Sequence, residues 1–137
     1  MTDGTNLLDP AHMKYLLLAL PLAIASCAGS HSTIQDGYAF KMSKAQAANL
    51  VKTTMEANIV ADRMLPTSEL VASGYDRALL DTQTYTLTAV PVPAKGAYGL
   101  ELNHNGTMFN GPAKADAIFK SAVERASVTG TKVSINN

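Results

Sequence analysis

The stretch Thr82-Gln83-Thr84-Tyr85-Thr86-Leu87-Thr88-Ala89-Val90 decides the fold class of this chain, because it has the clearest strand pattern. Threonines occupy alternate positions and share one face, while Tyr85 and Leu87 share the other face. Side chains alternate between the two faces of a strand, and β-branched and aromatic residues suit a pleated, half-buried surface. The stretch therefore predicts a strand in a half-buried sheet.

The segments on either side of this strand predict its neighbours. Pro91 and Pro93 end the strand or restrict its tail to a sheet edge, and Lys95-Gly96 predicts a turn. Beyond the turn, alternate apolar residues predict another strand, and Asn105-Gly106 predicts a tight hairpin into residues 107–109. On the amino-terminal side, residues 66–81 are predicted to form a loop with one helical turn.

Two helices are predicted on either side of these strands. Ser43 and Gln46 have the spacing of a capping box, and apolar residues then recur every three or four positions until Pro66 limits the helix. Pro112 suits the first turn of a second helix, which carries an apolar stripe of Ala115, Ile118, Phe119, Ala122, Val123 and Ala126.

Short alternating segments at 38–42 and 132–135 predict a first and a last strand. The predicted order is therefore strand, helix, three strands, helix, strand. This order indicates an α+β domain, with a small and mostly antiparallel sheet and two helices packed on one face.

The amino-terminal part has a different pattern. Lys14 precedes a short apolar run, and small residues then lead to Cys27, the single cysteine of the chain. A positive charge, an apolar core and small residues are the three regions of a secretory signal peptide. The run is too short to span a bilayer, whose hydrocarbon core is about 30 Å thick.

The segment Ile24-Ala25-Ser26-Cys27 resembles the lipobox of bacterial lipoproteins. The resemblance implies cleavage between Ser26 and Cys27 and a covalent lipid on the Cys27 thiol, with no other cofactor. Because Ala28-Gly29-Ser30 follow and not aspartate, it also implies an outer-membrane anchor facing the periplasm. Two alternatives remain, an ordinary signal peptide that leaves Cys27 as a free thiol and a buried helix in which Cys27 is a small apolar residue.

These features divide the chain into four parts. Residues 1–12 carry two aspartates that do not fit a signal peptide, so they are interpreted as a misassigned or non-native extension before Met13. Residues 13–26 form the predicted signal peptide. Residues 27–37 are the predicted lipidated cysteine and a flexible polar tether, and residues 38–137 form a single α+β domain.

Composition excludes several kinds of partner. Eleven basic and eleven acidic residues balance, so the chain has no electrostatic signature of nucleic-acid binding. There is no tryptophan, and aromatic residues make up 6% of the chain, which leaves few platforms for stacking on sugars or bases. No second cysteine or histidine stands at metal-ligand spacing from His31 or His104, so no metal site is predicted.

No enzyme motif is found. The carboxylates of Asp76, Asp81, Glu101 and Asp116 cannot be paired from the sequence, and no activated serine or phosphate loop is present. We therefore predict a non-catalytic domain.

The candidate interaction residues are those that the strand pattern exposes or places at a loop, namely Thr84, Thr86, Thr88, His104 and Asn105. The threonine face and the proline-flanked strand would suit addition of a strand from a partner, and a solvated outer face is the alternative. The prediction is an envelope or secretion-assembly accessory that binds protein. The other hypothesis is a periplasmic module for a small or lipidic ligand, with a pocket at Met55, Ile118 and Phe119.

Overall fold

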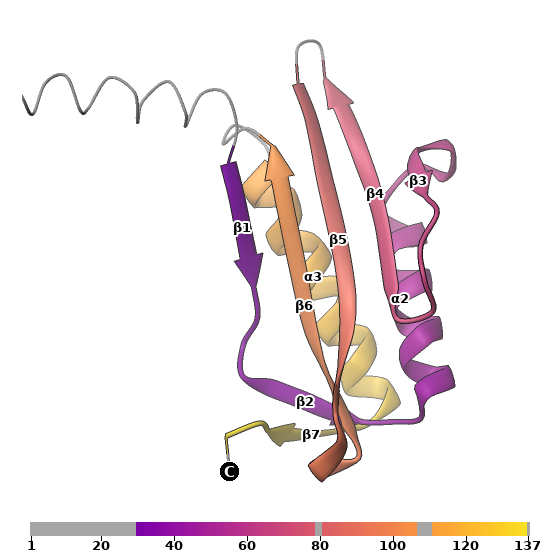
Figure 1. The fold of residues 1–137 in the computed structure, drawn as a ribbon, viewed down its shortest axis with the longest axis vertical. Coiled ribbons are helices and arrows are strands. Elements are labelled where there is room, and N and C mark those ends of the chain that lie inside the picture. The colour runs from indigo at the N-terminus through magenta and orange to yellow at the C-terminus, as the bar shows by residue number, and fades with distance from the viewer. Residues whose placement is uncertain (1–29, 79–80, 107–110, 137) are drawn as a thin grey trace, which may run out of the picture.

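The computed structural model describes residues 30–78, 81–106 and 111–136. Over these residues the chain forms seven strands and two α-helices, with two short 3₁₀ turns (Figure 1). The strands are β1 (Ser30–Ile34), β2 (Tyr38–Lys41), β3 (Met64–Leu65), β4 (Val71–Ala78), β5 (Asp81–Val92), β6 (Ala97–Gly106) and β7 (Thr131–Ser134). The helices are α2 (Lys44–Asn58) and α3 (Gly111–Thr129), and the 3₁₀ turns are Ala61–Arg63 and Pro93–Lys95.

The strands form one antiparallel sheet with the order β3-β4-β5-β6-β2-β7. Strand β6 is long enough to pair with two strands along the same side: β2 pairs with residues 97–99 and β1 with residues 102–106. The two long strands β5 and β6 therefore lie in the interior of the sheet, and β1 is an edge strand beside the second half of β6.

Both helices pack on the same face of the sheet, where they also contact each other (Figure 1). The core between helices and sheet contains aliphatic side chains and the fully buried aromatic rings of Phe40 and Tyr85. From α2 it takes Leu50, Val51 and Met55, and from α3 the stripe Ala115, Ile118, Ala122 and Ala126. The α+β fold with two helices on one face of an antiparallel sheet is thus confirmed.

Local sequence signals account for the helix ends. The Ser43 side chain accepts a hydrogen bond from the Gln46 backbone N–H, and the Gln46 side chain accepts one from the Ser43 N–H. This is the predicted capping box. The 3₁₀ turn at Pro93–Lys95 ends at Gly96, whose φ of 57° is the left-handed conformation that glycine adopts readily, so the predicted turn at Lys95-Gly96 is also present.

The structure differs from the predictions in two segments. Ser30–Ile34, assigned to a flexible tether, forms β1, in which Ser30 lies opposite Gly106 and Ile34 opposite Leu102. Residues 71–78, predicted as part of a loop, form β4 and pair with β5 over their whole length. Main-chain hydrogen bonds to a longer neighbouring strand hold both segments in the sheet. Such hydrogen bonds cannot be predicted from the order of polar and apolar side chains. The strand predicted at residues 107–109 lies outside the described residues.

Candidate functional site

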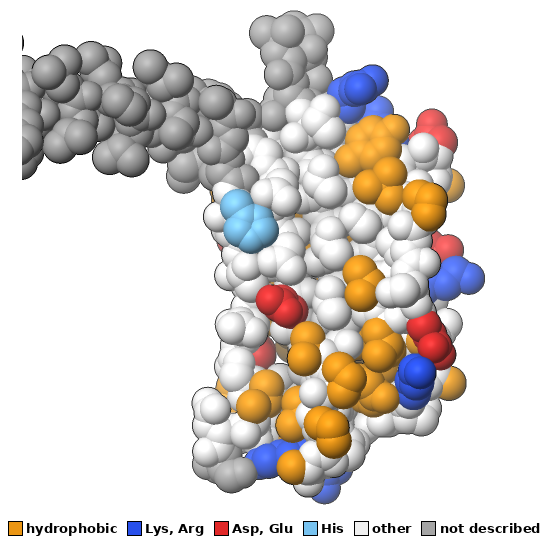
Figure 2. Space-filling model, in the orientation of Figure 1, with side chains coloured by type: hydrophobic (Ala, Val, Ile, Leu, Met, Phe, Trp, Pro, Cys, Tyr) orange, Lys and Arg blue, Asp and Glu red, His pale blue; other side chains and the backbone are white. Residues whose placement is uncertain are grey.

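The face of the sheet opposite the helices carries the threonines of β5. Gln83, Tyr85, Leu87 and Ala89 are buried toward the helices, so Thr84, Thr86 and Thr88 point to the other face, where they are half-buried. No described helix covers this face, which we call the open face (Figures 1 and 2). In Figure 2 backbone and uncharged polar side chains (white) fill much of its upper left part, and hydrophobic side chains gather lower down and along the right-hand side.

Cross-strand neighbours continue two of the threonines, Thr84 and Thr86, into polar rows. Thr86 lies between Ser73 of β4 and Asn103 of β6, and Asn103 lies opposite Thr33 of β1. The Ser73 and Thr86 hydroxyls are 2.9 Å apart, and the Thr33 hydroxyl donates to the Asn103 side-chain oxygen at 2.7 Å. These hydrogen bonds fix the rotamers of side chains that face solvent.

A second row lies next to the first. Thr84 lies between Tyr75 and Asn105, and Asn105 lies opposite His31. His31 Nδ1 is 2.8 Å from the Asn105 side-chain oxygen, so it donates this hydrogen bond. Asn105, a predicted interaction residue, therefore lies on the open face together with the threonines. The strand β1 supplies an end of each row, which the sequence did not predict.

His104 lies on the opposite face, which corrects its predicted place at an exposed hairpin tip. It is 1% exposed, its ring stacks on Tyr85 with centroids 5.2 Å apart, and its Nε2 is 2.5 Å from the Gln83 side-chain oxygen. The reason is strand periodicity, since Leu100, Leu102 and His104 occupy alternate positions of one long strand. His104 is thus part of the buried interior and is removed from the candidate interaction residues.

The predicted strand addition is not available at the threonines. Strand β5 pairs with β4 from Asp81 to Thr88 and with β6 from Thr84 to Val92, so Thr84, Thr86 and Thr88 are paired on both sides, whereas the part with Pro91 is paired with β6 alone. A strand that is paired on both sides has no free row of main-chain groups for a partner. Only contact through the side chains of the open face remains for Thr84, Thr86 and Thr88.

The lower end of the open face is apolar. Tyr38, Val90 and Ile135 are each exposed by about two fifths, and together with Val92 and Gly99 they line a shallow cavity of about 400 Å³. The Ile135 side chain lies over Gly99, where no side chain intervenes. The open face therefore combines a polar upper half with an apolar lower end.

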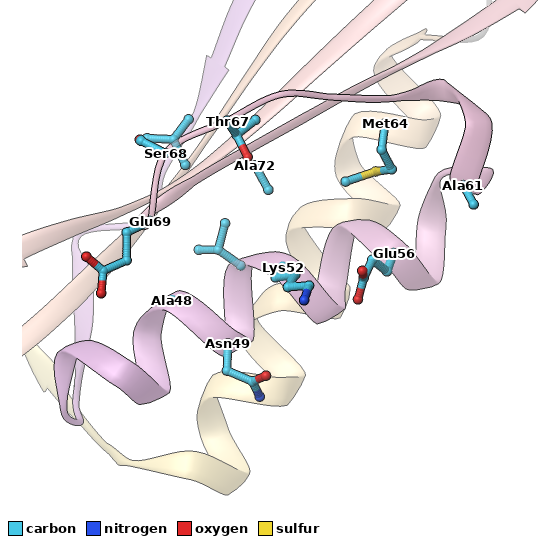
Figure 3. Close-up of a pocket in the computed structure, with 12 residues that line it drawn as sticks. Ala48, Asn49, Lys52, Glu56, Ala61, Met64, Thr67, Ser68, Glu69 and Ala72 are labelled. Atoms are coloured by element: carbon cyan, nitrogen blue, oxygen red, sulfur yellow. The ribbon is translucent and has the colours of Figure 1, made fainter.

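A larger cavity of about 790 Å³ lies elsewhere, between α2 and the chain from Ala61 to Ala72 (Figure 3). Its lining includes Val51, Val71 and Ala72. Met64 lies across the cavity from α2 (Figure 3). The rim carries polar and charged side chains, among them Asn49, Lys52, Glu56, Thr67, Ser68 and Glu69. This is an apolar interior with a polar margin, the composition that small-molecule sites share.

The cavity is not where the sequence placed it. Met55 and Ile118 are fully buried in the core, and Phe119 packs against that core. The predicted pocket residues thus fill the space between helices and sheet. The cavity lies instead between α2 and the chain from Ala61 to Ala72. The short strand β3 pairs with Ser73 and Gly74, and this pairing holds the connecting chain next to the helix.

Asp76 and Glu101, two of the four acidic residues considered in the sequence, lie on opposite faces of the sheet and do not form a carboxylate pair. The Asp76 carboxylate is 2.6 Å from the Lys114 ammonium and 4.0 Å from the Arg63 guanidinium on the helix side, whereas Glu101 lies opposite Thr88 on the open face. Within the described ranges no group of three or more His, Cys, Asp or Glu side chains could hold a metal ion. Among the helices of the same ranges, none is both long and apolar enough to cross a membrane.

Ser26 and Cys27 lie outside the described residues. A comparison with models of known protein families finds no match for this chain, and no curated protein is significantly similar to it in sequence.

Proposed function

We propose that this chain is an exported lipoprotein, anchored to the cell envelope through a lipid on Cys27, whose domain binds a protein partner without catalysing a reaction. The lipobox-like segment Ile24-Ala25-Ser26-Cys27 supports the anchor, and the residues Ala28-Gly29-Ser30 favour the outer membrane. The open face supports the binding function. The partner is a protein of the envelope or of a secretion assembly at the periplasmic side.

The open face is the observation that carries the proposal. Its two polar rows run from β4 across the interior strands β5 and β6 to the edge strand β1, and three side-chain hydrogen bonds hold their members in place. Side chains that are already ordered lose less conformational entropy when a partner covers them. The apolar end at Tyr38, Val90 and Ile135 adds surface whose burial is favourable.

The size of the open face suits a protein partner. Strand β5 has 12 residues, so at about 3.3 Å per residue the face is about 40 Å long. Four strands spaced by about 4.8 Å make it roughly 19 Å wide. The product is roughly 760 Å², close to the roughly 800 Å² that each partner contributes to a standard protein interface.

Site-specific photocrosslinking tests the binding face. A benzophenone side chain at Thr86 is expected to give a discrete crosslinked product in cell membranes, because Thr86 lies at the centre of the open face. The matched control is the same side chain at Lys120, an exposed residue of α3 on the helix side. The measurement is the yield of the crosslinked band, identified by mass spectrometry.

The proposal requires one envelope protein to be crosslinked from Thr86 and from Thr88 but not from Lys120. No product at either threonine, or equal products at all three positions, would count against a partner on the open face.

The larger cavity, between α2 and the chain from Ala61 to Ala72, favours a second function, which is the binding of a small apolar or lipidic ligand. Its volume of about 790 Å³ lies within the range of roughly 300 to 1,000 Å³ that is typical of ligand pockets. Val51, Val71 and Met64 would contact an apolar ligand, while Lys52 and Glu56 at the rim would contact its polar end.

Ala48→Phe tests this second function by filling the cavity. Ala48 is a half-buried lining residue of α2, so a phenyl ring there would occupy space that a ligand needs. Binding of the fluorescent probe anilinonaphthalene sulfonate is expected to fall severalfold. Ala57→Phe is the control, since Ala57 is an exposed residue of the same helix. Equal probe binding by the two variants would reject the cavity as a ligand site.

A further inference from the structure

We infer that the lipid anchor holds the end of the sheet where β1 begins against the bilayer, with the Pro93–Lys95 turn farthest from it. This inference rests on the proposed lipidation of Cys27. It replaces the predicted picture of a domain on a flexible tether. It also adds a restriction on the partner, which must reach the membrane surface.

The first observation is the short chain between the anchor and the fold. Two residues, 28 and 29, separate Cys27 from Ser30, the first residue of β1. A fully extended chain advances about 3.3 to 3.6 Å per residue, so the Cys27 and Ser30 backbones are at most about 11 Å apart. The domain therefore cannot move away from the bilayer by more than this link allows.

The second observation is that β1 is a fixed part of the sheet. It pairs with β6 from Ser30 opposite Gly106 to Ile34 opposite Leu102. Two side-chain hydrogen bonds reinforce this pairing, from His31 to Asn105 at 2.8 Å and from Thr33 to Asn103 at 2.7 Å. The anchor point is thus joined to the longest strands of the domain with no flexible segment after Ser30.

The third observation is the direction of the strands. Strand β1 begins beside the end of β6, and Thr82 near the start of β5 lies at the same end of the sheet (Figure 1). The Pro93–Lys95 turn joins β5 to β6 at the opposite end. Since β5 has 12 residues, about 40 Å separate the two ends.

Charge among the described residues does not draw a different end of the sheet to the membrane, since the exposed Arg77 lies opposite Thr82 at the same end as the anchor. Asp76 is paired with Lys114 at 2.6 Å and approaches Arg63 at 4.0 Å, so these two cations are partly neutralised by one carboxylate. A cluster of unpaired cations would be needed for strong attraction to anionic headgroups. Orientation therefore follows from the position of the lipid and the rigidity of β1.

The orientation specifies the partner more closely. His31, at one end of a polar row, follows Cys27 by four residues and lies opposite Asn105, and the open face extends from there away from the membrane. A protein that covers both polar rows must stand next to the domain and close to the headgroups. The inferred partner is therefore membrane-bound or rests on the membrane surface.

Fluorescence quenching by lipids that carry a spin label on the headgroup tests the orientation. The full chain is produced in bacteria with Thr82→Cys or Ala94→Cys, and each new thiol is labelled with a small fluorophore. A lipidated Cys27 is a thioether and does not react, so the new cysteine is the single labelled site. Both replaced residues are exposed, and they lie at opposite ends of β5.

Quenching is expected to be severalfold stronger at position 82 than at position 94. Inserting 12 Gly and Ser residues between Gly29 and Ser30 is expected to remove most of that difference, because such a linker spans about 20 Å. Equal quenching at the two positions, stronger quenching at position 94, or no effect of the insertion would overturn the inferred orientation.

Incorporation of a palmitate analogue into the same samples separates the two proposals. Lipidated protein with equal quenching at both positions would reject the orientation and leave the anchor in place. Absence of lipid from the unsubstituted chain would reject the anchor and, with it, the orientation. Circular dichroism of each cysteine variant checks that the fold is intact.

Discussion

Replacing Cys27 with alanine is expected to abolish incorporation of a clickable palmitate analogue and to move the protein from the membrane fraction to the soluble fraction. In a lipobox the cysteine sulfur atom carries the lipid. Alanine at position 27 has no sulfur atom, so it offers no replacement. Each buried methylene contributes about 0.8 kcal/mol, so two or three long chains bind a membrane far more firmly than one. Label, intact mass and fractionation are the measurements.

Ser26→Ala is the matched control for this change. It keeps a small residue before the cysteine and leaves the thiol in place, so label and membrane association are expected to persist. The lipoprotein proposal would be rejected if the unsubstituted chain took up no palmitate. Cys27 would then be an ordinary thiol, either free or buried.

The second large effect is expected for Gly130→Ala, between the end of α3 and the start of β7. A methyl group at Gly130 would overlap the carbonyl oxygen of Lys41, a backbone atom of β2. Because β2 pairs with β7 as well as β6, the backbone can shift only by disturbing both pairings. We expect the free energy of unfolding to fall by about 3 kcal/mol, the upper end for overpacking, as measured by urea denaturation.

Gly99→Ala provides the comparison, since Gly99 is a buried glycine of β6. A methyl group there would meet the Ile135 side chain at 3.4 Å and the Tyr38 carbonyl oxygen at 3.5 Å, which are ordinary contact distances. Its effect is expected to stay below about 1 kcal/mol. Similar losses of stability in the two variants would show that close backbone approach at Gly130 is not the cause.

Several parts of the fold were predictable because their signals are local. The capping box of Ser43 and Gln46 starts α2, and the apolar stripe of α3 gives the face that it buries. The alternation from Thr82 to Val90 assigned the buried and open sides of β5 correctly. In each case the residues that determine the outcome lie within one helix or along one strand.

The candidate site was predictable only in part. The threonines were identified from strand alternation. Asn105 was identified only as part of the predicted Asn105-Gly106 turn, and His104 was misplaced because that turn suggested that the strand ended earlier. Counting the alternation of Leu100 and Leu102 one step further would have placed His104 with the buried residues. The larger cavity had no sequence signal, because its walls come from a helix and from a connection whose path depends on β3.

The sequence by itself determined the α+β class, both helices, the two-sided character of β5 and the lipobox-like segment. Only the tertiary structure decided that β5 is interior, that the polar stretch Ser30–Ile34 forms an edge strand, and that the open face joins β1, β4, β5 and β6. The physical reason is that strand pairing uses main-chain hydrogen bonds, and every residue except proline carries both the donor and the acceptor that they need, whatever its side chain. A short polar segment can therefore become a strand wherever a long neighbour such as β6 offers an unpaired edge.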